Sequence, residues 1–200
     1  TQRDVDALNA AYPGLFNITT DRDNWDYVYN AADLISLKGR KYHSKKNHVN
    51  SFRKRYKYEY VPLTPALAES CIEFTYEWCR QRSCDQDPLM ICERDAVIEA
   101  LSHMAVLDFV GGVILIDGKV EAFTFGEPLN PEMAVIHVEK ANPAYNGIYA
   151  VINQEFCQHN WQNMKYINRE EDTGSEGLRK AKLSYHPVKM IEKFTITLRS

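Results

Sequence analysis

The sequence predicts an α+β domain with a mixed, mainly antiparallel central sheet flanked by helices. Residues 111–126 contain two alternating runs of β-branched and aromatic residues joined by Asp117-Gly118. Asp-Gly favours a two-residue hairpin turn because both central residues need positive φ. A third alternating run covers residues 133–140, and apolar residues recur at helical spacing over residues 148–157. A hairpin, a strand and a helix therefore follow one another, as in a sheet that carries packed helices.

Length and composition indicate one globular domain over residues 1–200. The chain is 44% hydrophobic and 26% charged, which is enough to bury a core of its own. It has no apolar run of about 18 residues and no basic segment followed by an apolar one at its start. We therefore expect a cytoplasmic protein. Because the first residue is Thr1, we also expect a trimmed or processed piece of a longer chain.

The net charge of −3 hides a local basic segment. Residues 38–57 contain nine Lys or Arg and no acid, whereas the whole chain has 24 basic and 27 acidic residues. One interpretation is a solvated basic face balanced by the acidic remainder. The other is a docking surface for nucleic acid or an anionic group.

The N-terminal half alternates short extended and helical segments. Residues 1–30 are polar and rich in Asp, and their aromatic residues alternate as in a short strand, so we expect an N-terminal arm or an edge strand. Asp33 is predicted to cap a short helical turn that ends at Gly39. A basic helix is expected over residues 40–56.

Two further helices precede the hairpin. Thr64-Pro65 is an N-cap followed by proline at the first helical position, which predicts a helix to about Arg82. A polar connection then leads to a helix over residues 93–109. After the central unit we expect a strand at 165–168, a polar loop at 169–177, a basic helix or turn at 178–185 and a strand at 190–198.

The loop over residues 141–147 is the first candidate site. It delivers a helix N-terminus to the end of a central strand, where free backbone N–H groups and the helix dipole favour an anionic group such as a phosphate or carboxylate. Gly147 lies at this helix start. Tyr145 and Tyr149 would either flank the pocket or pack against its surroundings.

The five cysteines suggest neither a disulfide framework nor a metal site. They are Cys71, Cys79, Cys84, Cys92 and Cys157, and none forms a C-x-x-C pair. Buried reduced thiols are the simplest interpretation. A site made of Cys84, Cys92 and His103 would match no zinc spacing, so no metal site is predicted.

Several common catalytic motifs are missing. The chain contains no G-x-S-x-G, P-loop, G-x-G-x-x-G or H-E-x-x-H sequence. Serine hydrolase, P-loop NTPase, dinucleotide-binding and zinc-protease activities therefore lack sequence support, and no covalent nucleophile is evident.

Two sequence blocks carry a family resemblance. The segment LKGRKYHSKKNHVNSF at residues 37–52 and the segment YINREEDTGSEGLRKAKLSYHP at residues 166–187 are similar to blocks of proteins that resemble the C-terminal domain of phosphatidylglycerol lysyltransferase. The order of elements is also similar to the GNAT-type acyltransferase fold. At Gly147, however, the segment AYNGIY departs from the usual Q/R-x-x-G-x-G/A pyrophosphate loop of that fold.

The resemblance implies a GNAT-like domain related to aminoacyl-tRNA-dependent transferases, often the second of two tandem copies. It implies that Lys45, Lys46 and Asn47 contact phosphates or shape the pocket. Asn168, Glu171 and Asp172 would face the acceptor or the donor's α-amino group, whereas Arg179 and Lys182 would hold an anionic group near the reacting ester. The alternatives are an exposed acidic loop at residues 170–172, and pairing of Arg179 and Lys182 with that loop.

Two functional hypotheses follow. The first is an acyl- or aminoacyltransferase that positions an amine or hydroxyl beside an activated carbonyl without a covalent intermediate, with aminoacyl-tRNA or an acyl-CoA as donor. No further cofactor is assigned. The second is a non-catalytic module of the same fold that binds RNA or an anionic metabolite through the basic helix at residues 38–57.

Overall fold

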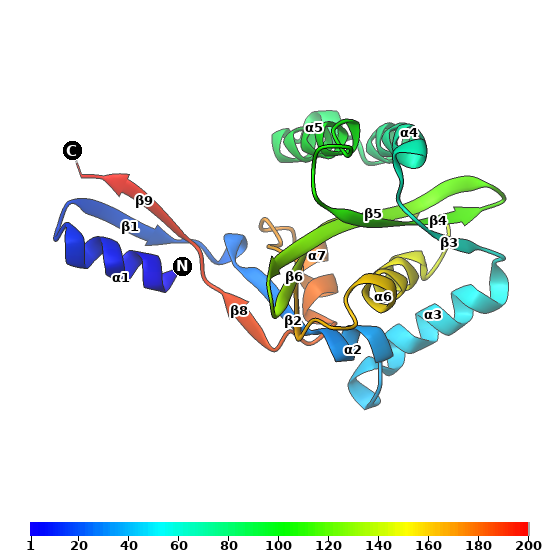
Figure 1. Ribbon diagram of the computed structural model, residues 1–200, viewed down its shortest axis with the longest axis horizontal. Helices are drawn as coiled ribbons and strands as arrows, with labels where there is room; N and C mark the ends of the chain where they lie inside the picture. Colours follow the sequence, from blue (N-terminus) through cyan, green and yellow to red (C-terminus); the bar gives the residue numbers. More distant parts are fainter. Residues whose placement is uncertain (200) are drawn as a thin grey trace.

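A seven-strand sheet forms the centre of the computed structural model, which describes residues 1–199 (Figure 1). The strand order is β3-β4-β5-β6-β7-β2-β8. Of its neighbouring pairs, β6–β7 is parallel and the others are antiparallel. The predicted mixed, mainly antiparallel sheet is therefore confirmed. In chain order the strands are β2 (Asp26–Asn30), β3 (Glu59–Pro62), β4 (Val110–Ile116), β5 (Lys119–Asn130), β6 (Met133–Ala141), β7 (Tyr166–Asn168) and β8 (Lys189–Ile191).

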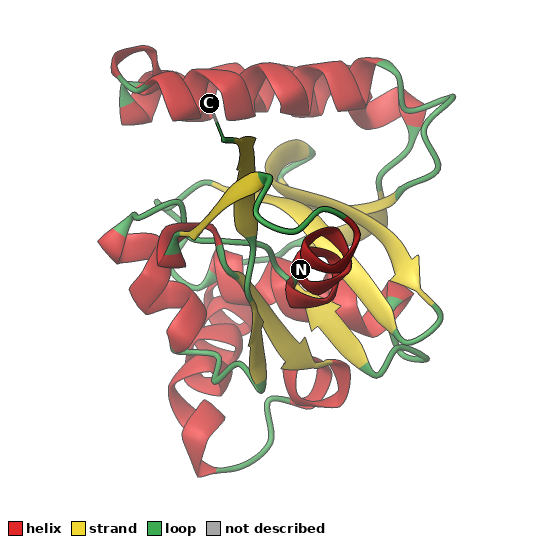
Figure 2. Cartoon of the chain, turned by 90° about the vertical axis from the view of Figure 1, so that its left-hand side faces the viewer, coloured by secondary structure: helices red, strands yellow, loops and turns green. Residues whose placement is uncertain are grey.

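Helices cover both faces of the sheet (Figures 1 and 2). One face carries α2 (Ala31–Ser36), α3 (His43–Arg55) and α6 (Ile148–Asn160), and the other carries α4 (Pro65–Arg82) and α5 (Pro88–Ser102). Each side has its own cluster of buried residues, with Phe156 and Phe52 in the first and Phe123 and Trp78 in the second. Short 3-10 helices are η1 (Arg22–Asn24), η2 (Arg40–Tyr42) and η3 (Cys84–Gln86), and α7 (Glu176–Leu183) follows β7. Within residues 1–199, no helix combines the length and apolar character needed to cross a membrane.

The chain termini form an arm that projects from the body of the molecule (Figure 1). It contains α1 (Gln2–Ala11), β1 (Phe16–Thr20) and β9 (Phe194–Leu198), and the two strands pair antiparallel with Phe16 opposite Leu198. The aromatic strand predicted near Tyr27 corresponds to β2. It lies between β7 and β8, and its first four residues are buried.

Local capping chemistry explains where the helices begin and end. The predicted start of α4 at Thr64-Pro65 is confirmed. By contrast, α5 begins five residues earlier than predicted, because the Asp87 side chain accepts a hydrogen bond from the Leu89 N–H and Pro88 occupies the first position. It ends at Ser102, before the predicted end at residue 109. The N-cap of α2 is Asn30, with Asp33 in the first turn, and Leu37 ends it with φ of 45°.

The single strand predicted over residues 190–198 was wrong. It divides into β8, which pairs with β2 in the large sheet, and β9, which pairs with β1 in the arm. Between them lies Lys193, whose Nζ contacts Asp26 at 2.6 Å and Glu171 at 2.9 Å. These ion pairs fix the chain to the body at the point where it leaves the sheet.

The predicted hairpin is confirmed, and the strand that follows it carries a bulge. Asp117 and Gly118 both have positive φ, at 51° and 77°. Further along, Phe125 lies opposite Val138, but Gly126 lies opposite Ile136. His137 is therefore an extra residue on β6, which is the definition of a β-bulge.

Candidate functional site

The helix start at Gly147 is packed against α3. Gly147 has φ of 97°, and a Cβ atom there would lie 2.6 Å from the carbonyl oxygen of His48. The Ile148 N–H is already bonded to the Tyr145 carbonyl at 3.1 Å. The negative end of a backbone dipole thus approaches this turn from the side of α3.

A group of basic side chains, here called the cation cluster, is centred on Arg169, whose guanidinium lies over the buried ring of Tyr185. It consists of Lys45 from α3, Arg169 after β7 and Lys182 from α7. The Lys45 Nζ lies 4.1 Å and the Arg169 Cζ 4.7 Å from the centre of the Tyr185 ring. Lys182 donates hydrogen bonds to the backbone carbonyls of Arg169 and Glu171. Segments distant in the sequence therefore bring three cations together.

Glu139 pairs directly with Arg169 of the cation cluster. Arg169 donates from Nε to Glu139 at 3.1 Å, and its Nη2 also bonds to that residue. Asn153 of α6 donates to the other oxygen of Glu139 at 2.7 Å. The buried Nη1 of Arg169 has no hydrogen-bond partner within residues 1–199. Glu139, Glu170 and Glu171 also lie close enough to Lys182 to favour its charged form. Lys45 forms no ion pair within residues 1–199 and one Arg169 donor is left over, so these two cations favour a negatively charged ligand.

Burial shifts the proton affinity of both lysines. Desolvation, reinforced by the nearby positive charge of Arg169, lowers the pKa of Lys45 to about 8 and the pKa of Lys182 to about 8. An anion bound beside them would oppose both effects. Shifted lysines at one point are typical of functional sites, although structural networks can also produce them.

A second cluster, here called the Asp172 network, lies next to the cation cluster along the chain. Asp172 is fully buried and accepts hydrogen bonds from Tyr27 and from Arg179, whose Nε and Nη2 lie 2.9 Å and 2.7 Å from its two oxygens. Hydrogen bonding to Arg179, which outweighs the effect of burial, holds the pKa of Asp172 well below its usual range. Arg179 also pairs with Asp23. Of the two roles considered for Arg179, pairing with the acidic loop is the one seen here.

Asn168 and Glu171 of the 168–172 segment belong to a separate set of contacts around Asp26 and Lys193. Asn168 donates to Asp26 at 2.9 Å and accepts from the Glu170 N–H at 2.7 Å. Burial alone would raise the pKa of Glu171, but its bond to Lys193 contributes to a net lowering. These carboxylates and amides are already paired within the protein, and the loop is not a simple exposed acidic run.

The other predicted site residues lie apart from both clusters. Lys46 and Asn47 are exposed on α3, and Asn47 contacts the His43 ring at 3.3 Å. Tyr145 packs edge-on against Tyr56 at 5.1 Å between ring centres. The hydroxyl of Tyr149 accepts a hydrogen bond from the Trp78 indole at 3.1 Å. Of the predicted residues, the structure therefore places Lys45 and Lys182 near Arg169 and pairs Asp172 with Arg179. It links Asn168 to Glu171 through Asp26 and Lys193.

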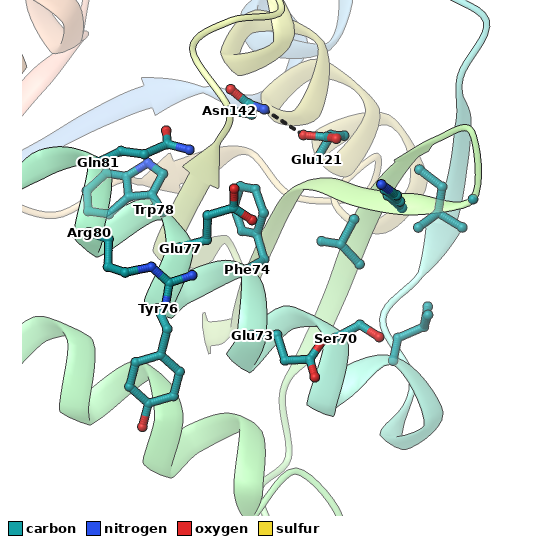
Figure 3. Close-up of a pocket in the computed structure, with 15 residues that line it drawn as sticks. Ser70, Glu73, Phe74, Tyr76, Glu77, Trp78, Arg80, Gln81, Glu121 and Asn142 are labelled. Atoms are coloured by element: carbon teal, nitrogen blue, oxygen red, sulfur yellow. Dashed lines mark hydrogen bonds between the residues drawn. The ribbon is translucent and has the colours of Figure 1, made fainter.

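A cavity of about 740 Å³ lies between α4 and the β4–β5 hairpin (Figure 3). Carboxylates from Glu73, Glu77 and Glu121 line it, and Glu121 accepts a hydrogen bond from Asn142 at 2.8 Å. Trp78 adds an aromatic wall. Lys119 and Arg80 also line the cavity, so its lining carries a small net negative charge. It is therefore less suited than the cation cluster to a phosphate.

Sequence reasoning missed Arg169, Glu139 and Tyr185 as parts of the site. Arg169 follows the short strand β7 directly, and a lone Arg after a buried strand was the available signal. Tyr185 lies inside the second resemblance block. Their partnership depends on the parallel pairing of β6 with β7, which brings residues 133–135 beside residues 166–168.

Comparison with known proteins gives a consistent result. The family model described as "Phosphatidylglycerol lysyltransferase, C-terminal" matches residues 1–197. A conserved protein of unknown function from Bacteroides thetaiotaomicron VPI-5482 is 45% identical, with a TM-score of 0.93 over 98% of this chain and 67% of its own. L-PGS from Bacillus licheniformis is 14% identical, with a TM-score of 0.68 over 99% of this chain and 66% of its own.

Two further proteins show how far the similarity extends. A tandem GNAT protein from the clavulanic acid biosynthesis pathway has a TM-score of 0.52 at 10% identity, covering 99% of this chain and 59% of its own, which supports the GNAT-like fold alone. An uncharacterized protein of Mycoplasmoides gallisepticum is 21% identical over 178 residues. The match covers 86% of this chain and 55% of that protein, so the chain spans little more than half the length of this curated relative.

Proposed function

The chain belongs to the phosphatidylglycerol lysyltransferase C-terminal family, and from this membership we propose that it is a transferase that moves an aminoacyl or acyl group from an activated donor to an amine or hydroxyl. The observation that carries the proposal is the cation cluster. Lys45 and Lys182 come from the two sequence blocks that resemble the family, and both lie close to Arg169.

The proposed mechanism relies on positioning and charge. The cation cluster would hold the anionic part of the donor and stabilise negative charge on the carbonyl oxygen as the acceptor attacks. The new C–N or C–O bond forms, and the donor's ester or thioester bond breaks. No covalent intermediate with the protein is needed, in keeping with the lack of a recognised nucleophile motif in the sequence.

Aminoacyl-tRNA is the donor that we favour over an acyl-CoA. The segment before α6 departs from the Q/R-x-x-G-x-G/A pyrophosphate loop of the GNAT fold. In addition, the carbonyl oxygen of His48 lies close to Gly147. The cavity lined by Asn142 of the same segment carries three carboxylates against two cations, Arg80 and Lys119, and this net negative charge disfavours a pyrophosphate. A terminal tRNA phosphate at the cation cluster avoids both obstacles.

A second candidate function is binding without catalysis. Among the basic residues of α3, Arg53 forms an ion pair with Glu155 at 2.7 Å, and within residues 1–199 Lys46, Lys54 and Arg55 form none. These three exposed cations could bind RNA by charge alone. Such a module would bind uncharged tRNA and transfer nothing.

A donor screen separates the two functions. The purified protein is incubated with a mixture of labelled aminoacyl-tRNAs, and separately with acyl-CoA thioesters, in the presence of amine, hydroxyl and lipid acceptors. We expect a labelled product from aminoacyl-tRNA that depends on protein concentration. If no donor gives a labelled product and uncharged tRNA binds tightly, the protein is a binding module and the transferase proposal is wrong.

A further inference from the structure

A second cavity, of about 420 Å³, lies between α5 and strands β5 and β6. Its walls include Val97, Phe109 and Phe125, and the two phenylalanine rings lie 4.7 Å apart between their centres. The polar lining contains His137 and four carboxylates, from Glu93, Asp108, Glu127 and Glu170. The cavity thus combines an apolar floor with a strongly acidic edge.

The β-bulge explains how His137 reaches this cavity. Successive side chains of a regular strand point to opposite faces of the sheet, so His137 and Val138 would diverge. Because His137 is the extra residue, both line the cavity. Gly126 permits the close approach of the strands, since a Cβ atom there would lie 2.1 Å from the Val135 carbonyl oxygen. Bulges commonly redirect a side chain in this way beside functional sites.

Two carboxylates hold the His137 ring from either side. Its Nδ1 lies 2.8 Å from Glu170 and its Nε2 lies 3.2 Å from Glu127. Hydrogen bonding to Glu170 is the largest cause that raises the pKa of His137 above its ordinary value. Glu93 is paired with Lys140 at 3.0 Å, whereas Asp108 forms no ion pair within residues 1–199. Even with His137 protonated, the cavity edge retains excess negative charge.

We propose that this cavity binds a small primary amine with an apolar, preferably aromatic, body. The ammonium group would lie at the acidic edge of the cavity, near Glu127 and Glu170, and the apolar body would pack against Phe109 and Phe125. Neutral and anionic analogues lose the carboxylate contacts, so charge determines the preference. This inference stands on the cavity and does not depend on the transfer reaction proposed above.

The arrangement couples binding to the protonation of His137. An ammonium near the two carboxylates places a second positive charge beside the imidazolium, so binding favours the neutral ring and releases a proton. Affinity should rise with pH while His137 titrates, by at most tenfold per pH unit, and become constant above its raised pKa. Glu93, Asp108, Glu127 and Glu170 are the other charged groups that face the cavity.

Calorimetric titration of the purified protein tests the proposal, with 2-phenylethylamine as probe and 2-phenylethanol and 3-phenylpropanoate as charge-altered analogues. We expect saturable binding of the amine at least tenfold tighter than that of either analogue. Glu127→Gln and Glu170→Gln should each weaken amine binding about tenfold. The matched control is Glu132→Gln, which removes an exposed carboxylate that pairs with Lys165 outside the cavity.

The outcomes are distinct. If the amine fails to bind the unmodified protein, or if the alcohol binds it equally well, the proposal is overturned. This result does not depend on the behaviour of the variants. If Glu127→Gln and Glu170→Gln bind the amine as tightly as Glu132→Gln does, the site is elsewhere. The transfer assay is unaffected by any of these results, so the two proposals can fail separately.

Discussion

The ammonium of Lys45 lies 4.1 Å from the centre of the Tyr185 ring. Lys45 belongs to the basic helix α3, and Tyr185 belongs to the segment that follows α7. The guanidinium of Arg169 shares the same ring. A buried aromatic ring thus stabilises two cations, of which only Arg169 pairs with Glu139, and this arrangement is the physical basis of the proposed anion site.

Two substitutions of Tyr185 distinguish the contribution of its ring to stability from that of its hydroxyl. Tyr185→Leu should destabilise the protein by about 2 to 4 kcal/mol, because it leaves a void and removes the ring from two cations. Tyr185→Phe keeps the ring and should cost less than about 1 kcal/mol. Denaturant unfolding measures both. Equal losses for the two variants would show that the hydroxyl, rather than the ring, matters.

Lys182 should make stability depend on pH in alkaline solution. Its pKa is about 8 in the folded protein, and an unfolded lysine titrates near 10.4. Between these values the unfolded chain binds more protons, so stability rises with pH, by at most about 1.4 kcal/mol per pH unit, and this gain is lost as pH falls through 8. Unfolding measured from pH 7 to 10.5 should show a smaller rise for Lys182→Met. Parallel curves would contradict the shifted pKa.

The pair formed by Arg169 and Glu139 should be strongly coupled. Their side chains are 11% and 14% exposed, and Arg169 contacts the carboxylate through two nitrogens. Arg169→Met should cost roughly 3 to 5 kcal/mol because it leaves the buried Glu139 charge without its cation, with only the Asn153 hydrogen bond remaining. Adding Glu139→Gln should recover part of that loss. In a double-mutant cycle by denaturant unfolding, additive losses would mean that the two groups do not interact.

Local signals in the sequence were sufficient for much of the fold. The Asp117-Gly118 turn and the Thr64-Pro65 helix start depend on neighbouring residues alone, and both were predicted correctly. The start of α5 was missed because Asp87-Pro88 was assigned to a connection instead of a cap. The break at Lys193 depends on partners far along the chain, namely Asp26 and Glu171, which no local pattern reveals.

Less of the candidate site could be predicted from the sequence. Lys45 and Lys182 were singled out through the family resemblance, but Arg169 and Glu139 become neighbours only when β6 and β7 pair. His137 was missed because it lies within a run of strand residues, and its position depends on a register shift between β5 and β6. The roles assigned to these residues remain predictions.

The exposed cations of α3 should contribute to tRNA binding through charge. Replacing Lys46, Lys54 and Arg55 by Gln should make the negative slope of log affinity against log salt concentration shallower by about 2 to 3. Each phosphate contact contributes roughly 0.7 to 0.9 to the magnitude of that slope. Filter binding of uncharged tRNA between 50 and 200 mM salt, as rough limits, measures the slope. The matched control replaces three exposed cations elsewhere, Arg3, Lys119 and Lys180. If that variant changes the slope equally, net charge rather than α3 is responsible.

The central claim is that the cation cluster holds the donor during transfer. Its most direct test is the single-turnover rate of aminoacyl transfer by the Lys182→Ala variant compared with Lys180→Ala, which removes an exposed lysine from the same helix. We predict a rate at least tenfold lower for Lys182→Ala, and an unchanged rate for Lys180→Ala, in folded protein. Equal rates for both variants would contradict the account.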